Sequence, residues 1–249
     1  MLAASTTGCG ATPVGGNGPD AGVRLVRLTV RGRVVDAESC SDATRGCQPV
    51  RGVVVAAAGA TDVRSAPTGA DGAFRLDGLP RGFASALLLI PQDTAGARYA
   101  PTLNPQIVPA DSSVAEIFGA ELYVLPRDTG SLLDAVEREA GFDLVATGGY
   151  VGQAVLETGR TPVDGATAIV YPAQEPVRFV NVLPSIAPGE MALRPATATT
   201  TGPFGMFVVP ATGPRDDLAI VPVKDGLAFT LIDTRVQPGE VAFAVHFGR

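Results

Sequence analysis

The sequence contains no tryptophan, one histidine and three cysteines among its 249 residues. A single histidine cannot supply the clustered ligands of a catalytic zinc site, and the H-E-x-x-H motif of metallopeptidases is absent. No G-x-S-x-G motif is present to position a serine nucleophile. Without tryptophan, a carbohydrate site built on stacked rings is disfavoured, although four tyrosines remain. We therefore expect a protein that is not an enzyme, with no catalytic residue, cofactor or metal.

Positive charge is scarce as well. The chain has 19 lysines and arginines against 25 aspartates and glutamates, and Lys224 is the only lysine. Such a chain lacks the basic surface that phosphate backbones require, so we expect no nucleic-acid partner. The longest apolar stretches, 52–60 and 83–90, have the length of strands and fall short of the about 18 residues of a membrane-spanning helix. Any membrane association would need a lipid anchor.

The first 22 residues contain a candidate for such an anchor. Cys9 follows small residues in "MLAASTTGCG", and a Gly/Pro-rich segment comes after it. This arrangement resembles the end of a bacterial lipoprotein signal, in which the cysteine receives lipid. The basic and long apolar regions of a full signal are missing, so a free cysteine in a flexible leader is the alternative. The lipidated form predicts a location in the bacterial cell envelope, at the periplasm or the outer-membrane surface, and an unlipidated form would be secreted.

Cys40 and Cys47 bracket a short polar loop, "CSDATRGC". In an exported protein, a disulfide is the expected use of two cysteines so placed. Zinc is the alternative, but two thiols without a nearby histidine or a second cysteine pair do not complete a four-ligand site. We therefore predict a Cys40–Cys47 disulfide.

Three short patterns occur twice, in the same order. The segment 68–74 matches 201–207 as T-G-x-x-G-x-F, and "PVRG" at 49–52 matches "PVDG" at 162–165. Upstream of them, Gly32 in "VRGRVVD" corresponds to Gly152 in "YVGQAVLE". We interpret the halves as two related β domains with different loops. The first carries the cysteine loop, and the second carries an insertion near 172–195.

The periodicity within each half is that of strands. Apolar residues alternate with polar or small ones in 26–34 and in 241–247. Asp71 and Gly72 are the preferred pair for a two-residue hairpin turn, and Gly205 occupies the corresponding place in the second half. Calcium at Asp62, Asp71 and Asp77 is the alternative, but the spacing of a calcium loop is missing.

Two side-chain patterns concern the faces of the predicted strands. Arg27, Arg31 and Arg33 share one face of the first strand, where we expect acidic residues of a neighbouring strand or solvent as their partners. His246 falls with the small residues of the last strand, so we expect it to be solvated or lightly packed.

One helix is predicted between the halves. Ser131 is a candidate N-cap with Asp134 three residues later, and Gly141 is a candidate stop. The apolar side of "LLDAVEREA" would cover the edge of a sheet or an interface.

The repeated patterns allow a comparison with a known family. "GRVVDAE", "PVRGVVVAAAG" and "SAPTGADGAFRLDGLPRG" resemble the carboxypeptidase regulatory-like domain, and "GQAVLETGRTPVDGATAIVYP" with "TATTTGPFGMFVVPA" resembles a divergent second copy. The resemblance implies an all-β chain of two tandem Ig-like, transthyretin-like β-sandwiches of about seven strands each, joined by a short helix. The expected divisions are a leader at 1–22, a sandwich at 23–127, a helical connector at 128–147 and a second sandwich at 148–249.

Such domains serve as spacers, binding modules and enzyme accessories, so the resemblance fixes no activity. We expect a non-catalytic envelope protein that binds, presents or supports something at the bacterial surface. The alternative is an accessory module that binds a ligand, such as a glycan, beside a hydrolase. The expected partner is a surface protein or a glycan. Because the insertion departs from the shared scaffold, its residues Phe179, Asn181 and Leu183 are the candidates for a partner-binding loop.

Overall fold

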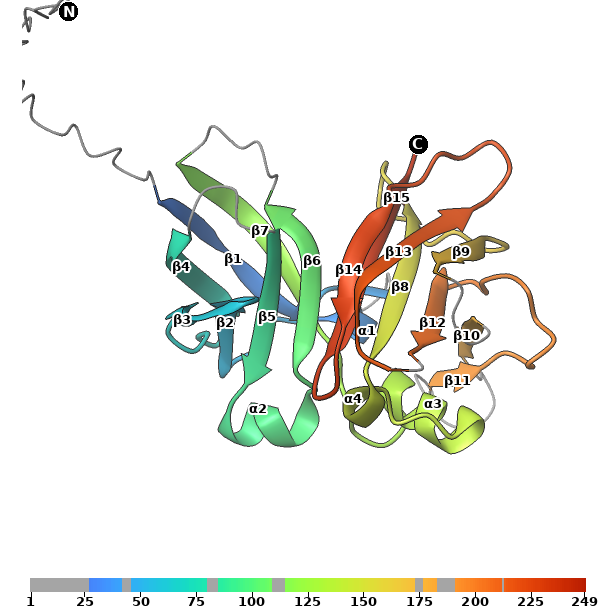
Figure 1. Ribbon diagram of the computed structural model, residues 1–249, viewed down its shortest axis with the longest axis horizontal. Helices are drawn as coiled ribbons and strands as arrows, with labels where there is room; N and C mark the ends of the chain where they lie inside the picture. The colour runs from blue at the N-terminus through green and yellow to red at the C-terminus, as the bar shows by residue number, and fades with distance from the viewer. Residues whose placement is uncertain are drawn as a thin grey trace, which may run out of the picture.

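The computed structural model describes residues 27–41, 46–79, 85–108, 115–172, 177–182, 191–211 and 213–249. It is an all-β protein in which two Ig-like sandwiches lie side by side, the first formed by β1–β7 and the second by β8–β15 (Figure 1). No helix in the described part of the chain is long and apolar enough to cross a membrane.

The first sandwich packs a three-stranded sheet against a four-stranded one. Its strands are β1 (Leu28–Asp36), β2 (Val53–Ala57), β3 (Ala60–Arg64), β4 (Ala73–Leu79), β5 (Ser85–Pro91), β6 (Thr102–Val108) and β7 (Glu116–Val124). One sheet has the order β4-β1-β7, with β1 and β7 parallel. The other has the order β3-β2-β5-β6. The core between them contains Val30, Leu76 and Leu89, none of which is exposed.

The second sandwich repeats this strand order. Its strands are β8 (Gly149–Leu156), β9 (Thr167–Tyr171), β10 (Arg178–Val182), β11 (Met191–Leu193), β12 (Met206–Pro210), β13 (Arg215–Val223), β14 (Ile232–Val236) and β15 (Val241–Gly248). The order β12-β8-β15, with β8 and β15 parallel, corresponds to β4-β1-β7. The order β9-β13-β14 corresponds to β2-β5-β6.

The halves differ where the second one carries additional residues. In the first half, β3 pairs with the outer edge of β2. In the second half, the chain after β9 crosses to the other sheet, where β10 pairs with β12 and β11 pairs with β10. No described strand therefore occupies the place beside β9 that β3 occupies beside β2.

The repeated glycines Gly72 and Gly205 have the same environment. Their φ angles are +71° and +64°, a region that residues with a Cβ rarely adopt. A Cβ on Gly72 would lie 2.4 Å from the carbonyl oxygen of Val34, and one on Gly205 would lie 2.3 Å from that of Ala154. Only glycine fits because the turn is pressed against a strand at both places.

The repeated threonines make the same hydrogen bonds. The hydroxyl of Thr68 donates to the carbonyl of Val50 at 2.7 Å and accepts from the amide of Val53 at 3.0 Å. In the second half, the hydroxyl of Thr201 donates to the carbonyl of Val163 at 2.8 Å and accepts from the amide of Ala166 at 3.0 Å. Both side chains are buried, and each ties its turn to the segment at which β2 or β9 begins.

Asp71 and Gly72 form a turn, but it is not the hairpin turn that we expected. The amide of Gly72 donates to the carbonyl of Gly69, and a carboxylate oxygen of Asp71 accepts from the amide of Ala73 at 3.0 Å. The strand before the turn pairs with β2, whereas the strand after it pairs with β1. The turn therefore links the two sheets of the first sandwich. At Gly205, in contrast, the strands before and after the turn, β11 and β12, belong to one sheet, in which β10 lies between them.

Backbone pairing joins the two sandwiches. β15 runs parallel to β6, with Val241 opposite Thr102 and Ala242 opposite Leu103, so that one nine-stranded sheet extends through both halves. β14 packs against β6, and Leu103 of β6 belongs to the same buried cluster as Ile232 and Val236 of β14. The junction is therefore held by main-chain pairing together with a shared core.

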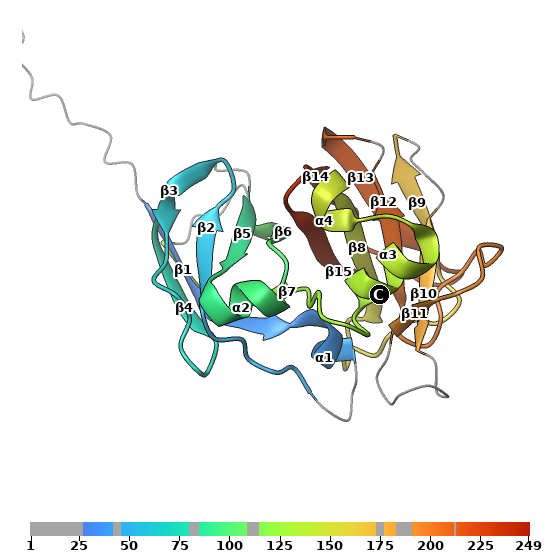
Figure 2. The ribbon, with the colours of Figure 1, turned by 90° about the horizontal axis from the view of Figure 1, so that it is seen from below.

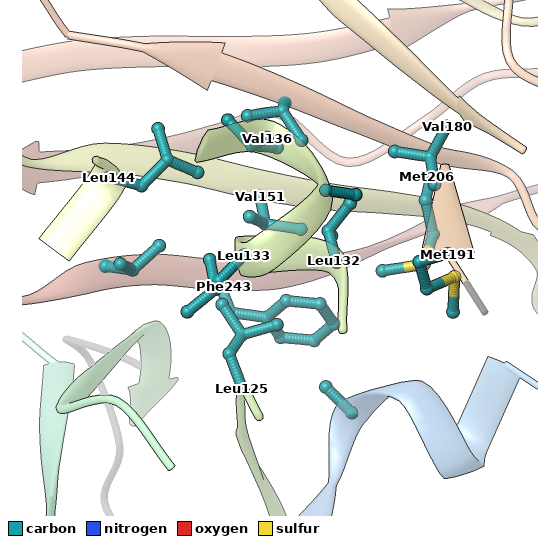
Figure 3. Packing of buried hydrophobic residues seen from close by; sticks show 14 of the residues in the cluster. Leu125, Leu132, Leu133, Val136, Leu144, Val151, Val180, Met191, Met206 and Phe243 are labelled. Atoms are coloured by element: carbon teal, nitrogen blue, oxygen red, sulfur yellow. The ribbon is translucent and has the colours of Figure 1, made fainter. Parts of the chain in front are cut away.

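The helices lie mainly at one end of the molecule, opposite the start of β1 and the end of β15 (Figures 1 and 2). They are α1 (Ala37–Ser41), α2 (Asp93–Arg98), α3 (Leu132–Ala140) and α4 (Leu144–Thr147). The amide of Asp134 donates to the hydroxyl of Ser131 at the start of α3, and Gly141 ends the helix with a φ of +72°, as the sequence predicts. Figure 3 shows Leu132, Leu133 and Val136 packed on the second sandwich. The helix also covers the edge strand β11, where the carboxylate of Glu139 accepts from the amide of Leu193, so the expected cover at a sheet edge is confirmed. Its apolar side packs on the face of the same sheet, in which β8 is buried.

Candidate binding cleft between the sandwiches

A cleft of about 260 Å³ opens where the two sandwiches meet. Its walls come from β6, β7, β14 and β15, and from the loop between β8 and β9. The lining residues are Asn104, Pro105, Gly119, Glu121, Tyr123, Arg160, Thr230, Ile232, Phe243, Ala244, Val245 and Phe247. Both halves of the chain contribute, so the cleft exists only because β15 pairs with β6.

Glu121 on β7 is the central charged residue of the cleft. One carboxylate oxygen accepts from Arg33 of the neighbouring strand β1 at 2.7 Å. The other accepts from the hydroxyl of Tyr123 at 2.8 Å and from Arg160. Burial opposes the ionisation of Glu121, but these hydrogen bonds outweigh it and hold its pKa below the usual value. Glu121 is therefore a carboxylate at neutral pH.

Arg160 closes the cleft from the side of the second sandwich. It lies in the loop after β8 with a φ of +52°. Its Nη1 donates to Glu121 and, at 3.2 Å, to the hydroxyl of Tyr123, and its guanidinium lies 6.0 Å from the centroid of the Phe247 ring. Its other nitrogen donors have no partner within the described segments, and half of its side chain is exposed. Two arginines around one carboxylate leave this cluster with one net positive charge.

Most of the other residues that line the cleft are apolar, and the contacts of Tyr123 fix its position. The rings of Tyr123 and Phe243 pack with their centroids 5.2 Å apart. Asn104 is buried, and its amide group both donates to the carbonyl of Tyr123 and accepts from its backbone amide, each at 2.8 Å. Asn104 thus replaces strand pairing between β6 and β7 and holds Tyr123 in position. Chemically, the cleft offers an apolar body with a cationic rim.

The predicted disulfide joins Cys40 and Cys47, as expected, and ties α1 to the segment leading to Pro49. The two sulfurs and a carboxylate oxygen of Glu121 lie within 4.8 Å of one another. Because the bridge uses both sulfurs, this group presents one free ligand and does not fit a metal ion. The disulfide therefore lies beside Glu121, and it packs against the buried cluster that contains Tyr123 and Phe243.

The strand-face arginines meet acidic partners. Arg31 lies 2.6 Å from Glu116, and Arg33 lies 2.7 Å from Glu121, both on β7. The expectation of cross-strand acids is confirmed for these two residues. The side chain of Arg27 instead extends along the backbone at Gly78 on β4.

The predicted partner-binding residues lie elsewhere. Phe179 on β10 is only 5% exposed and packs in the core with Phe207, so our expectation that it contacts a partner is wrong. The reason is that β10 extends the sheet at β12 and points Phe179 inward. The backbone of Asn181 pairs with Ala192 of β11. Leu183 and Cys9 lie outside the described residues.

His246 is fully buried, so the expectation of a solvated or lightly packed histidine is also wrong. β15 is an inner strand of the nine-stranded sheet, with α3 packed on one face and the β9-β13-β14 sheet on the other. Burial lowers the pKa of His246 to about 4. The imidazole is neutral and enclosed.

Sequence reasoning missed Glu121, Tyr123 and Arg160. They are separated in the sequence by up to 39 residues, and no short motif links them. The only local indication was the face shared by Arg31 and Arg33, for which acids on a neighbouring strand or solvent were expected, without identifying the acids.

No protein-family model and no curated protein matches the chain. Among solved structures, the chain is similar to the shaft pilin SpaA of Lactobacillus rhamnosus GG, with 12% identity, coverage of 90% of this chain and 98% of that chain, and a TM-score of 0.26. It is also similar to the minor pilin GBS52 of Streptococcus agalactiae, with 10% identity, coverage of 89% and 95%, and a TM-score of 0.27.

Proposed function

We propose that this chain is a non-catalytic, exported binding module built from two copies of one sandwich domain, and that its ligand occupies the cleft between them. The expected ligand combines an apolar body with a carboxylate or another anionic group. It is either a small molecule or the side chain and terminus of a peptide on a surface protein. A glycan bound beside a hydrolase is the second candidate, and the aromatic rings of Tyr123 and Phe247 at the cleft are the feature that favours it.

The observation that carries the proposal is the position of Arg160 at the rim of an apolar cleft. A guanidinium stacked on an aromatic ring keeps its orientation, and its unused donors suit the two oxygens of a carboxylate. The hydrogen bonds that Arg160 donates to Glu121 and Tyr123 also hold its side chain in place. A ligand would therefore meet a preorganised cation, which reduces the entropy lost on binding.

The absence of enzymatic activity is supported by the state of the only histidine. Both ring nitrogens of His246 are engaged, with Tyr150 and with the carbonyl of Thr230, and the ring is not exposed. A general base must reach the substrate within hydrogen-bond distance. His246 does not meet this requirement, and the charged residues of the cleft are paired with one another.

The shared strand order and the matching environments of Gly72 and Gly205, and of Thr68 and Thr201, support the interpretation as two copies. These features involve the backbone and buried hydroxyls that position the turns. They explain why the two halves have the same scaffold. The choice of ligand would depend instead on residues of the cleft that the halves do not share.

Binding is tested by screening aliphatic and aromatic carboxylates, their neutral amides, and a glycan panel against the full chain, with ligand-detected NMR and calorimetry. We expect carboxylates to bind and their amides to bind at least about tenfold more weakly, because the charge-assisted pair is lost. Arg160→Gln should remove this preference. Arg98→Gln is the matched control, since Arg98 also lies over a ring, that of Tyr99, and pairs with Asp128, but it lines no part of the cleft.

Equal binding of acids and amides, or unchanged binding in Arg160→Gln, would contradict the assignment of Arg160. Binding only to glycans would favour the second candidate.

The cellular location rests on Cys9 and on the disulfide. A bridge between Cys40 and Cys47 is typical of a protein that folds in an oxidising compartment. We propose that Cys9 carries lipid and holds the chain at the bacterial envelope. Labelling cells with a fatty-acid analogue should mark the natural full-length protein and not its Cys9→Ala variant. A wild-type protein that stays unlabelled would leave secretion as the location.

A further inference from the structure

The edge strand β9 in the second sandwich lacks a neighbour that the first sandwich has. β9 pairs with β13 on one side only, and no described strand pairs with its other side. In the first half, the corresponding edge of β2 is covered by β3. Five residues, Thr167–Tyr171, therefore present one row of backbone donors and acceptors without a strand partner.

The exposed face next to this edge is apolar. Ile169 is 57% exposed and Tyr171 is 73% exposed, and Val223 on β13 and Leu231 before β14 are exposed as well. Of the five large hydrophobic side chains that are exposed in the described part of the chain, these are four. Such clustering on one sheet is typical of an interaction surface.

The edge also lacks the usual protection against strand pairing. Natural edge strands carry charged residues, proline or bulges that prevent addition of another strand. β3, the edge strand of the first half, contains Asp62 and Arg64. β9 has the sequence "TAIVY", with no charge, no proline and four residues of high β propensity.

We infer that β9 is a self-association edge, at which it pairs antiparallel with β9 of a second copy of this chain. An uncharged five-residue strand pairs with its own copy over its full length when Ile169 lies on the two-fold axis. Ile169 then faces Ile169 of the second copy, and Thr167 faces Tyr171 of the second copy. All of these side chains already lie on the exposed face, so the register keeps that face apolar throughout.

The uncharged sequence of β9 is what allows a second copy to be the occupant. The net charge of −6 makes two copies repel each other, and pairing through β9 places no like charges against each other at short range, so this edge is where the repulsion is smallest. The two-fold symmetry closes the pair and leaves no further edge of this kind, so the product is a dimer and not a fibre. The two three-stranded sheets would become one of six strands.

The experiment measures the oligomeric state of the full chain carrying Cys9→Ser by sedimentation velocity across the micromolar range. We expect a concentration-dependent dimer. Ile169→Asp should weaken it at least about tenfold, because it places two carboxylates opposite each other at the axis. Phe118→Asp is the matched control, since Phe118 is also exposed, at 69%, but lies on β7 of the first sandwich. That variant should dimerise as the parent does.

A second variant tests the register. Ile169→Cys should form a disulfide-linked dimer on mild oxidation, because the two thiols meet at the axis. Val223→Cys, one strand away and in a different row, should not cross-link. A parent chain that stays monomeric at every concentration, a dimer that Ile169→Asp leaves unchanged, or cross-linking by both cysteine variants alike would overturn the inference. Because Ile169 points outward, these variants should retain the parent's thermal unfolding, which is measured alongside.

Discussion

The hydroxyl of Tyr150 lies 2.6 Å from Nε2 of His246, in the core of the second sandwich. On the other side of the ring, Nδ1 lies 2.9 Å from the carbonyl oxygen of Thr230. A carbonyl oxygen only accepts, so Nδ1 carries the proton, and Nε2 accepts the hydrogen bond from Tyr150. The pair is neutral and its polar atoms are satisfied, which is how a buried histidine is tolerated in a β-sandwich core.

This arrangement predicts a loss of stability in mild acid. Burial lowers the pKa of His246 from 6.5 to about 4. Between these values, the unfolded chain binds a proton that the folded chain does not, so the free energy of unfolding falls as the pH falls from 6.5 to 4. The shift corresponds to about 3 kcal/mol at pH 4. Urea unfolding across this pH range measures the change in the free energy of unfolding. His246→Gln should lack this pH-dependent decrease, whether or not the substitution also lowers the stability at pH 7.

Tyr150→Phe tests the hydrogen bond to His246 separately from the protonation of His246. It leaves Nε2 buried without a donor, which should cost about 1–3 kcal/mol at pH 7. The acid-dependent component should remain, because the ring is still buried. A variant that loses the pH dependence together with the hydroxyl would contradict burial as the main cause of the lowered pKa.

Alanine substitutions at the glycines of the repeated turns can be compared with one at a glycine that has free space around it. Gly72→Ala and Gly205→Ala should each destabilise the protein by about 3 kcal/mol, since positive φ and a clash with a strand carbonyl act together. Gly226→Ala should cost only about 1 kcal/mol, because Gly226 has a φ of +78° but no atom within 4 Å of a built Cβ. Chemical denaturation of the three variants compares them. Equal costs at all three positions would mean that the close approach of the turn to the strand contributes nothing.

The turns could be predicted from the sequence because their chemistry is local. A glycine at positive φ and an Asp-Gly pair set the backbone within four residues, and the α3 caps at Ser131 and Gly141 act over similar distances. The partner of the strand after each turn depends instead on the whole sheet. The local pattern at Asp71–Gly72 therefore predicted a turn correctly but gave it the wrong strand partners.

The cleft could not be predicted, for the same physical reason. Glu121 and Arg160 come together because β15 pairs with β6 and brings the second sandwich against the first. His246 was placed on a solvated face because it shares that side of the strand with alanines, yet α3 and the second sheet cover both faces of its strand. Phe179 was assigned to a loop because it falls in an insertion, whereas the insertion adds strands to a sheet. Sequence periodicity describes one strand and not the layers on either side of it.

Glu38 on α1 predicts a pH effect of the opposite sign. Its carboxylate lies 2.5 Å from the amide of Leu132 at the start of α3. Burial, with the neighbouring Asp36 and Asp128, raises the pKa of Glu38 to about 8, despite the opposing effect of that hydrogen bond and of Arg98. The folded chain therefore retains a proton that the unfolded chain loses above pH 4.5, and stability falls as the pH rises from 4.5 to 8.

The test is Glu38→Gln, which imitates the protonated carboxyl. It should match the parent at pH 4.5 and exceed its stability at pH 9. The full shift would correspond to about 5 kcal/mol, and because part of the side chain reaches solvent, we expect a difference of about 2 kcal/mol. Measuring the difference between variant and parent at each pH removes the contribution of His246, which both share. A parallel pH profile of the two proteins would contradict a raised pKa for Glu38.

The disulfide predicts a coupling between redox state and the cleft. Cys40 and Cys47 close a short loop, so their replacement by serine should lower the free energy of unfolding by about 2 kcal/mol. The bridge also packs beside Glu121, whose partners Arg33 and Arg160 shape the rim. We therefore expect the Cys40→Ser/Cys47→Ser variant to bind the carboxylate ligand more weakly than the parent while keeping its β-rich circular dichroism spectrum. Reduction of the parent with a dithiol should have the same effect on binding, and it should have no effect on the variant. A parent whose affinity is unchanged by reduction would show that Glu121 holds Arg160 in place without help from the bridge.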